Sequence, residues 1–183
     1  MDESRRNNSA RILEPIIDEN TENILSLEEA CQTLHNFVDD LSTAIQFSLE
    51  FAKKCKHDEI SIDEAASICL FKSTNNFSIV FNQILENPDR HLIKPWLPYL
   101  RLFLTALSKL PNFSGTIWYY QESDLCDRYK DREKRVWWAA IICTSSLTSL
   151  CSEHDSPCTI FSIETSQGKD ITNYSYQQTN REM

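Results

Sequence analysis

The chain has 183 residues, a length that predicts one domain. Hydrophobic residues make up 41% of it and charged residues 25%, which is typical of globular domains and argues against a chain that is disordered throughout. The 18 Lys+Arg against 27 Asp+Glu give a formal net charge of −9, and this acidic balance argues against a general nucleic-acid binder, which needs a clustered basic face.

The location of the protein is predicted from what its sequence lacks. No apolar run approaches the roughly 18 residues that a membrane span requires, and the N-terminal sequence has no apolar segment of a secretory signal. The seven cysteines include no C-x-x-C pair, so zinc and thioredoxin-type sites have little support. Cys151 and Cys158 are able to bridge a loop, but without a secretory signal we expect free thiols and a cytoplasmic protein.

The first half of the chain has the periodicity of helices. Residues 1–25 are charged and rich in asparagine, and we expect a flexible N-terminal arm there. Ser26 and Glu29 form the pattern of a capping box, followed by apolar residues at helical spacing as far as Ala52. A second capping box, Ser61 to Glu64, predicts a helix to about Lys72. Further helices are predicted over residues 78–86 and from Pro95 to Pro111.

The second half has the texture of strands. Three short runs are rich in β-branched and aromatic residues, at 115–120, 136–142 and 159–164. Charged or turn-forming stretches bound each run, which is typical of strands. Residues 145–151 suggest a helical turn between two of these strands. The prediction is therefore one α+β domain over residues 26–183, with a helical half at 26–110 and a strand-rich half at 111–183.

Motifs for familiar cofactors are missing. The chain has only two glycines, so it has no Gly-rich phosphate loop. Its four histidines are scattered without the spacing of metal ligands, and we predict no metal site. The run Lys130–Arg135 alternates in sign and predicts a solvated loop rather than a nucleic-acid patch. Composition and periodicity alone lead no further than an α+β domain.

Seven sequence blocks, in order along residues 26–183, resemble the arginine-specific mono-ADP-ribosyltransferases, in particular an intracellular branch of that family. They are Ser26–Cys31, Asp63–Ile68, Pro95–Leu110, Thr116–Trp118, Trp137–Trp138 with Cys143–Ser146, Gly168–Ile171, and Ser175–Tyr176. The resemblance implies an N-terminal helical region packed on a split β-sandwich. It also implies a transferase, classed with the glycosyltransferases and nucleotidyltransferases, that moves ADP-ribose from NAD+ or NADP+ to a protein arginine without a metal and releases nicotinamide.

The family carries its chemistry on three elements, namely an Arg, a Ser-x-Ser/Thr and a Glu-x-Glu. By the resemblance, Glu182 is the catalytic carboxylate, which stabilises the oxocarbenium-like ribose, and Thr144 contacts the dinucleotide as the second residue of Ser-x-Ser/Thr. This sequence departs from the family at three positions. Tyr119 stands in place of the phosphate-binding Arg, Ile142 in place of the first Ser, and Asn180 in place of the first Glu.

Alternatives to this interpretation stay open. A shift of register brings Ser145 and Ser146 into the place of the Ser-x-Ser/Thr element. Tyr119 and Tyr120 either stack on a ring of NAD+ or belong to the core, and the core is the favoured interpretation. The chain as a whole is either an ADP-ribosyltransferase, a catalytically dead relative that acts as a binding module, or a helical interaction protein whose acidic surface recruits basic partners.

Overall fold

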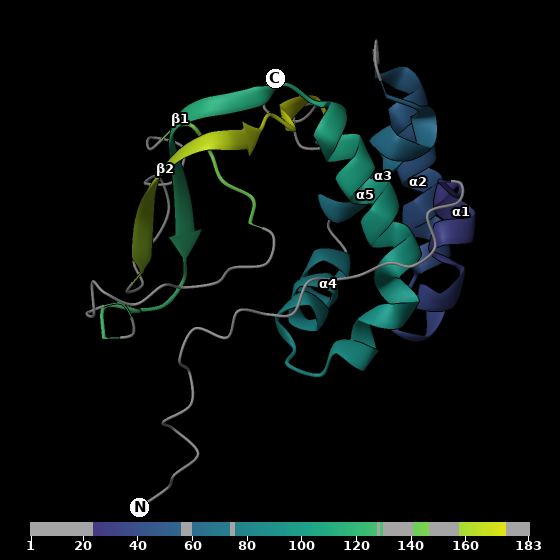
Figure 1. Cartoon of the computed structure of the whole chain (residues 1–183), viewed down its shortest axis with the longest axis horizontal. Coiled ribbons are helices and arrows are strands. Elements are labelled where there is room, and N and C mark those ends of the chain that lie inside the picture. Colours follow the sequence, from purple (N-terminus) through teal and green to yellow (C-terminus); the bar gives the residue numbers. More distant parts are fainter. Residues whose placement is uncertain are drawn as a thin grey trace, which may run out of the picture. The chain divides into compact units, whose positions relative to one another are not determined.

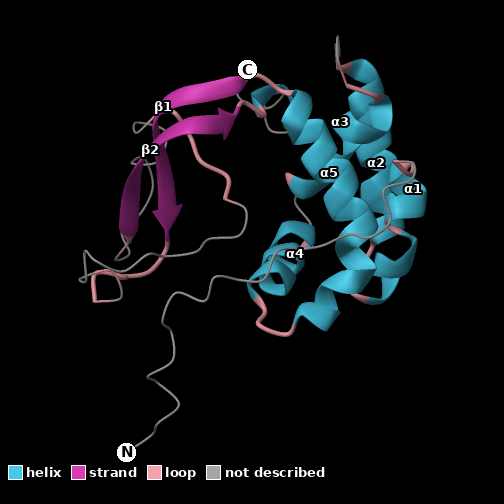
Figure 2. Ribbon diagram, viewed as in Figure 1, coloured by secondary structure: helices cyan, strands magenta, loops and turns pink. Residues whose placement is uncertain are grey.

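A computed structural model describes residues 24–55, 60–73, 76–127, 129, 141–146 and 158–174. These residues fall into two compact units, which Figure 1 and Figure 2 show as helices and strands. We call them the helical unit, which holds the described residues up to Asn112 and from Lys169 onward, and the strand unit, which holds those between Phe113 and Gly168. The architecture is α+β, as predicted: five α-helices precede a two-stranded antiparallel sheet in the described part of the chain.

The first predicted helix is interrupted. Instead of one helix from residue 26 to 52, the chain forms α1 (Leu27–Ala30), the 3₁₀ helix η2 (Gln32–Asn36) and α2 (Leu41–Lys54). Asp40 has φ 51° and ψ 24°, a left-handed conformation that no residue inside a right-handed helix adopts. The apolar periodicity persists across the break because Leu34 and Val38 are buried in the helical unit although they do not continue an α-helix.

The third helix, α3 (Ile62–Phe71), lies at the centre of the helical unit and is confirmed with its predicted start. The capping box is formed in both directions: the Glu64 amide donates to Ser61 Oγ at 3.2 Å, and the Ser61 amide donates to Glu64 Oε2 at 2.7 Å. Every residue from Glu64 to Phe71 is buried, because α3 packs against α2 on one side and α5 on another and also contacts α1 and α4.

Two more predicted helices complete the helical unit. They are α4 (Phe77–Glu86), which agrees with the prediction for 78–86, and α5 (Leu97–Lys109). The 3₁₀ helix η3 (Arg90–Trp96) precedes α5, so Pro95 belongs to η3 and Pro98 takes the place in the first turn of α5 that was predicted for Pro95.

Aromatic rings fill the space between α3, α4, η3 and α5. The Phe77 and Tyr99 rings meet edge to face with centroids 4.7 Å apart, and the Phe81 and Tyr99 rings do so at 5.3 Å. The Tyr99 hydroxyl donates to the carbonyl of Ser67 at 2.9 Å, so this buried polar group is satisfied. Such ring pairs contribute about 0.5–1.5 kcal/mol each beyond the burial of their area. The other members of this cluster are Phe71, Trp96 and Phe103.

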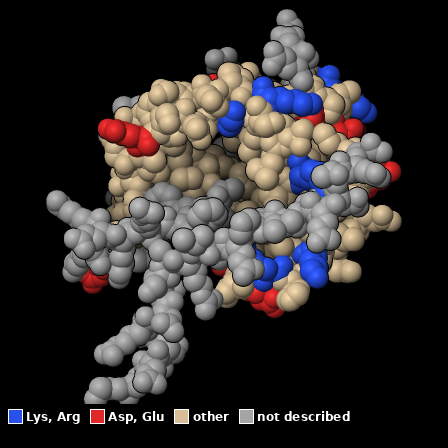
Figure 3. Space-filling view, in the orientation of Figure 1, with Lys and Arg blue, Asp and Glu red and all other residues tan. Residues whose placement is uncertain are grey.

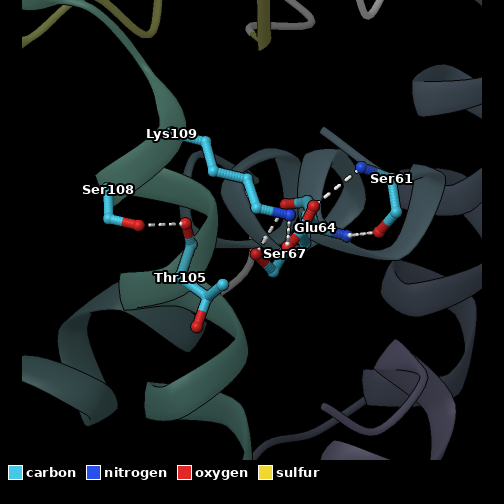
Figure 4. Close-up of polar contacts among 6 residues, drawn as sticks. All are labelled: Ser61, Glu64, Ser67, Thr105, Ser108 and Lys109. Carbon is cyan, nitrogen blue, oxygen red and sulfur yellow. Dashed lines mark hydrogen bonds and ion pairs between the residues drawn. The ribbon is translucent and has the colours of Figure 1, made fainter. Parts of the chain in front are cut away.

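A buried carboxylate joins α3 to the end of α5 (Figure 4). The Glu64 side chain is 2% exposed, and Lys109 Nζ lies 2.6 Å from its Oε1. Burial raises the pKa of Glu64, but the hydrogen bond and charge of Lys109 and the hydrogen bonds of Ser61 outweigh this effect. The pKa therefore lies below the ordinary value of 4.5, and the carboxylate is charged at neutral pH.

The strand unit is an antiparallel pair. The strands β1 (Asn112–Gln121) and β2 (Thr159–Lys169) lie side by side (Figure 1) and are both longer than the predicted runs 115–120 and 159–164. Most of the predicted strand 136–142 and of the predicted helical turn 145–151 lies outside the described residues. Their described ends, residues 141–142 and 145–146, form neither strand nor helix. The described part of the unit holds this two-stranded sheet and not a sandwich, so the split β-sandwich stays a prediction.

None of the helices in the described part of the chain is both long and apolar enough to cross a membrane. Cys158 has a free thiol, as expected, and Cys151 lies outside the described residues. On the face that Figure 3 shows, acidic side chains accompany the basic ones over the helical unit.

Candidate functional site

The residues predicted for the NAD+ site divide into two groups. Glu182 and Asn180 lie outside the described residues, so the catalytic carboxylate stays a prediction from the resemblance. Thr144, Tyr119 and Ile142 belong to the described part of the strand unit, and the geometry of the candidate site rests on these three.

The backbone of Thr144 pairs with β1. The Trp118 amide donates to the Thr144 carbonyl at 2.8 Å, and the Thr144 amide donates to the Trp118 carbonyl at 3.0 Å. The two residues form an antiparallel bridge. This bridge brings together two of the blocks that carry the resemblance, Thr116–Trp118 and Cys143–Ser146, although 24 residues lie between them in sequence.

The side chains around Thr144 differ in polarity. Thr144 Oγ1 accepts a hydrogen bond from the Ser146 amide at 3.1 Å, which fixes the turn after the bridge. Ile142, two residues earlier, is 42% exposed although it is apolar. A serine at this position would add a hydroxyl at a position that is open to solvent, and the isoleucine adds none.

Tyr119, which stands where the family has its arginine, packs within the strand unit. Its ring stacks on Phe161 of β2 with centroids 6.0 Å apart, and Tyr129 meets the same Phe161 edge to face at 5.0 Å. The Tyr119 hydroxyl donates to Gln121 Oε1 at 2.9 Å. Tyr119 thus packs on the sheet but is half-buried and does not belong to the buried core. Stacking of its ring on NAD+ stays an open alternative.

The thiol beside Thr144 has little nucleophilic character. Burial raises the pKa of Cys143 above its ordinary value of 9.0, so the thiol stays protonated at neutral pH. The described residues also contain no group of three or more His, Cys, Asp or Glu side chains that could hold a metal ion. Neither observation points to covalent thiol chemistry or to a metal centre at this site.

Gln121 and Phe161 are residues of this site that the sequence analysis missed. Gln121 ends β1 and orients the Tyr119 hydroxyl, and Phe161 supports the ring from the neighbouring strand. Alternation along β2 would have found Phe161, because the odd-numbered residues from Thr159 to Thr165 are less exposed than the even-numbered ones. No signal in a single sequence pairs position 161 with position 119.

The site therefore offers two hydroxyls, that of Thr144 at an isolated β-bridge and that of Tyr119, which donates to Gln121. None of the side chains at positions 119, 142 and 144 carries the positive charge expected for a phosphate. It fits a dinucleotide in part. No protein-family model, curated protein or solved structure matches this chain.

Proposed function

We propose that the chain is an ADP-ribosyltransferase-like protein of the cytoplasm that takes NAD+ or NADP+ as co-substrate and a protein arginine as acceptor. Glu182 is its catalytic carboxylate and Thr144 contacts the dinucleotide. The observation that supports the proposal most is the antiparallel bridge between Trp118 and Thr144. It supports the proposal because the resemblance implies that both blocks contribute to one site, and the bridge brings them together.

The reaction requires little covalent chemistry from the protein. The bond between ribose C1′ and the nicotinamide nitrogen breaks, and its electron pair leaves with nicotinamide. A guanidinium nitrogen of the acceptor then bonds to C1′ and gives up a proton. A carboxylate near C1′ stabilises the positive charge that develops on the ribose, so the charge of Glu182 is the contribution that a substitution tests.

The test is labelling of an acceptor. We expect the full chain, incubated with NAD+ that is radiolabelled in its adenylate part and with an arginine-rich polypeptide, to label the polypeptide. Glu182→Ala abolishes the labelling, because removal of one preorganised group costs about 10²–10³ in rate. Glu164→Ala is the matched control, since Glu164 is an exposed carboxylate of β2. Absence of labelling by the unaltered chain, or equal labelling by Glu182→Ala, contradicts the proposal.

A catalytically dead binding module is the second candidate, and the packing of Tyr119 favours it. Tyr119 carries no cation that would bind a phosphate, and its ring and hydroxyl are engaged by Phe161 and Gln121. A ligand that binds only the folded state raises its stability, by about 2.7 kcal/mol at a hundredfold excess over Kd. Absence of any thermal shift at millimolar NAD+ supports this second candidate against the first.

The double substitution Tyr119→Arg/Ile142→Ser separates the two candidates further. It restores the residue types that the resemblance implies, and a charge-assisted hydrogen bond contributes about 1.5–3 kcal/mol. We expect NAD+ to bind the double variant at least tenfold more tightly than the unaltered chain in a calorimetric titration. Tyr119→Phe is the control, because it keeps the ring and adds no cation. Equal affinity of the double variant and the unaltered chain would show that position 119 does not face a phosphate.

A further inference from the structure

The turn that follows β1 is held on the first residues of β2. Thr159, which begins β2, donates from Oγ1 to the Ser123 carbonyl at 2.8 Å, and the Leu125 amide donates to the same Oγ1 at 2.8 Å. Farther along the turn, the Tyr129 ring meets Phe161 of β2 edge to face, with centroids 5.0 Å apart. A hydroxyl and an aromatic pair therefore fix this turn to β2 at two places.

Two cysteines flank the hydroxyl contact. Cys126 directly follows Leu125 and Cys158 directly precedes Thr159, although 31 residues lie between the two cysteines in sequence. The hydrogen bond from Leu125 to Thr159 thus joins the immediate neighbours of the two cysteines. Both cysteines lie outside β1 and β2, beyond the same end of the antiparallel pair. The turn is therefore able to bring their Cα atoms to the roughly 5.5–6 Å of a disulfide without breaking the pairing of the strands.

The same two cysteines have the accessible thiols. Of the six described cysteines, Cys126 and Cys158 alone are exposed. Burial raises the pKa of each of the other four and keeps their thiols protonated and slow to react; these are Cys31, Cys55, Cys69 and Cys143. A thiol reagent in solution therefore meets this pair first.

The strand unit has little else to stabilise it. None of its described residues is buried, whereas the helical unit has a core of buried aromatic rings. A two-stranded sheet without a buried face is marginally stable in water. Small folds that lack a core depend on cross-links, because a covalent bridge removes conformations from the unfolded chain. A bridge between Cys126 and Cys158 would add such a cross-link where β1 ends and β2 begins.

We propose that Cys126 and Cys158 form a reversible disulfide site, which oxidised glutathione closes and which locks this end of the sheet. The thiolate of one cysteine attacks a sulfur of glutathione disulfide and displaces one glutathione thiolate, which leaves a mixed disulfide. The thiolate of the other cysteine attacks the protein sulfur of that mixed disulfide and displaces the second glutathione. The two cysteines lose two electrons and two protons, and one glutathione disulfide becomes two glutathione thiols. This inference does not depend on the proposed function.

The first experiment maps the disulfide. The reduced full-length chain is equilibrated in buffers of defined ratios of oxidised to reduced glutathione, quenched with acid, alkylated and digested without reduction for mass spectrometry. We expect one bridge, from Cys126 to Cys158 within a single chain, and no retained glutathione. Cys126→Ser is expected to keep a glutathione on Cys158, because the second displacement is lost.

The control for this mapping is Cys151→Ser. Cys151 comes seven residues before Cys158 in sequence and is the nearest other candidate for a bridge, although it lies outside the described residues. We expect this variant to form the bridge as the unaltered chain does. Pairing of Cys158 with Cys151, a bridge between two chains, or glutathione that stays on either thiol of the unaltered chain overturns the proposal.

A second experiment tests the geometry through Thr159. The equilibrium with glutathione gives the effective concentration of the two thiols for each other. Thr159→Val keeps the shape of the side chain and removes the hydroxyl that holds the turn, so we expect it to lower this effective concentration roughly tenfold. Thr165→Val is the matched control, because the Thr165 hydroxyl bonds to the Gln167 amide within β2. An unchanged effective concentration in Thr159→Val overturns the role of the turn in bringing the thiols together.

Amide hydrogen exchange then measures whether the bridge locks the sheet. We expect oxidation to slow exchange of the Leu125 amide, which is bonded to Thr159, by roughly tenfold or more. The Ala65 amide of α3, bonded to the Ser61 carbonyl at 2.9 Å, is the internal control and is expected to exchange at the same rate in both forms. Equal exchange of the Leu125 amide in the reduced and oxidised chains overturns the locking of the sheet.

Discussion

Glu64 shows how one residue serves both a local and a distant interaction. Its carboxylate accepts from the Ser61 amide three residues away and from Lys109, which lies 45 residues later. The capping box was predicted from four residues, because the partners of such a box are always adjacent in sequence. The contact with Lys109 was not predicted from the sequence, because it depends on how α3 and α5 pack against each other.

The pairing of Glu64 with Lys109 predicts a pH-dependent stability. A carboxyl whose pKa is lowered in the folded state contributes stability above its ordinary value of 4.5 and loses it as the pH falls through the folded-state pKa. We expect Lys109→Met to lower the free energy of unfolding by about 1–2 kcal/mol at pH 7, a modest value because Lys109 is 41% exposed. The measurement is urea unfolding at pH 7 and pH 3, with Lys53→Met as control. A difference from the unaltered chain that does not shrink at pH 3 contradicts this account.

At the scale of elements, Asp40 decides where α2 begins. It adopts a left-handed conformation immediately before Leu41, and its side chain forms no cap of α2. Apolar spacing alone predicted one helix from residue 26 to 52, since Leu34 and Val38 are buried at positions that a helix would also bury. Aspartate is one of the few residues besides glycine that tolerate this conformation, which is a weak signal in a sequence.

The left-handed conformation of Asp40 predicts that two substitutions change the free energy of unfolding in different ways. Asp40→Gly is expected to leave the free energy of unfolding unchanged or to raise it by up to about 1 kcal/mol, because glycine adopts positive φ without a steric penalty. Asp40→Val is expected to lower it by about 1–2 kcal/mol, since a β-branched side chain is strained there. Chemical denaturation followed by circular dichroism measures both. Equal stability of the glycine and valine variants would contradict the left-handed assignment.

For the whole molecule, the sequence predicted the helices and strands better than the long-range contacts that form the candidate site. Helices α3, α4 and α5 and the two strands follow from periodicity, caps and β-branched runs, which are local signals. The bridge from Trp118 to Thr144 joins residues 26 positions apart, and no local signal encodes it. The resemblance selected Thr144, but only packing decides that its neighbour is Trp118.

The cysteine thiols of the two units differ in exposure, and we expect them to differ in reactivity. Cys31 and Cys69 of the helical unit are inaccessible, and burial raises the pKa of each to about 12, whereas Cys126 and Cys158 of the strand unit are exposed. We expect iodoacetamide to alkylate Cys126 and Cys158 in the native protein at pH 8 and to spare Cys31 and Cys69. In rising urea, the two buried thiols become reactive together, because both lie in one cooperatively packed core. Mass spectrometry of the labelled peptides measures this, and labelling of Cys69 well before Cys31 would contradict a single core.

The burial of α3 has a consequence for how this chain tolerates change. Helices on the surface of a protein usually offer a solvent-facing position in every turn, but α3 offers none from Glu64 to Phe71. Eight consecutive codons therefore specify side chains that must fit their neighbours in volume and polarity. A lysine introduced in this window would place an ammonium group among buried side chains, and we expect it to lower the free energy of unfolding unless a partner satisfies its charge.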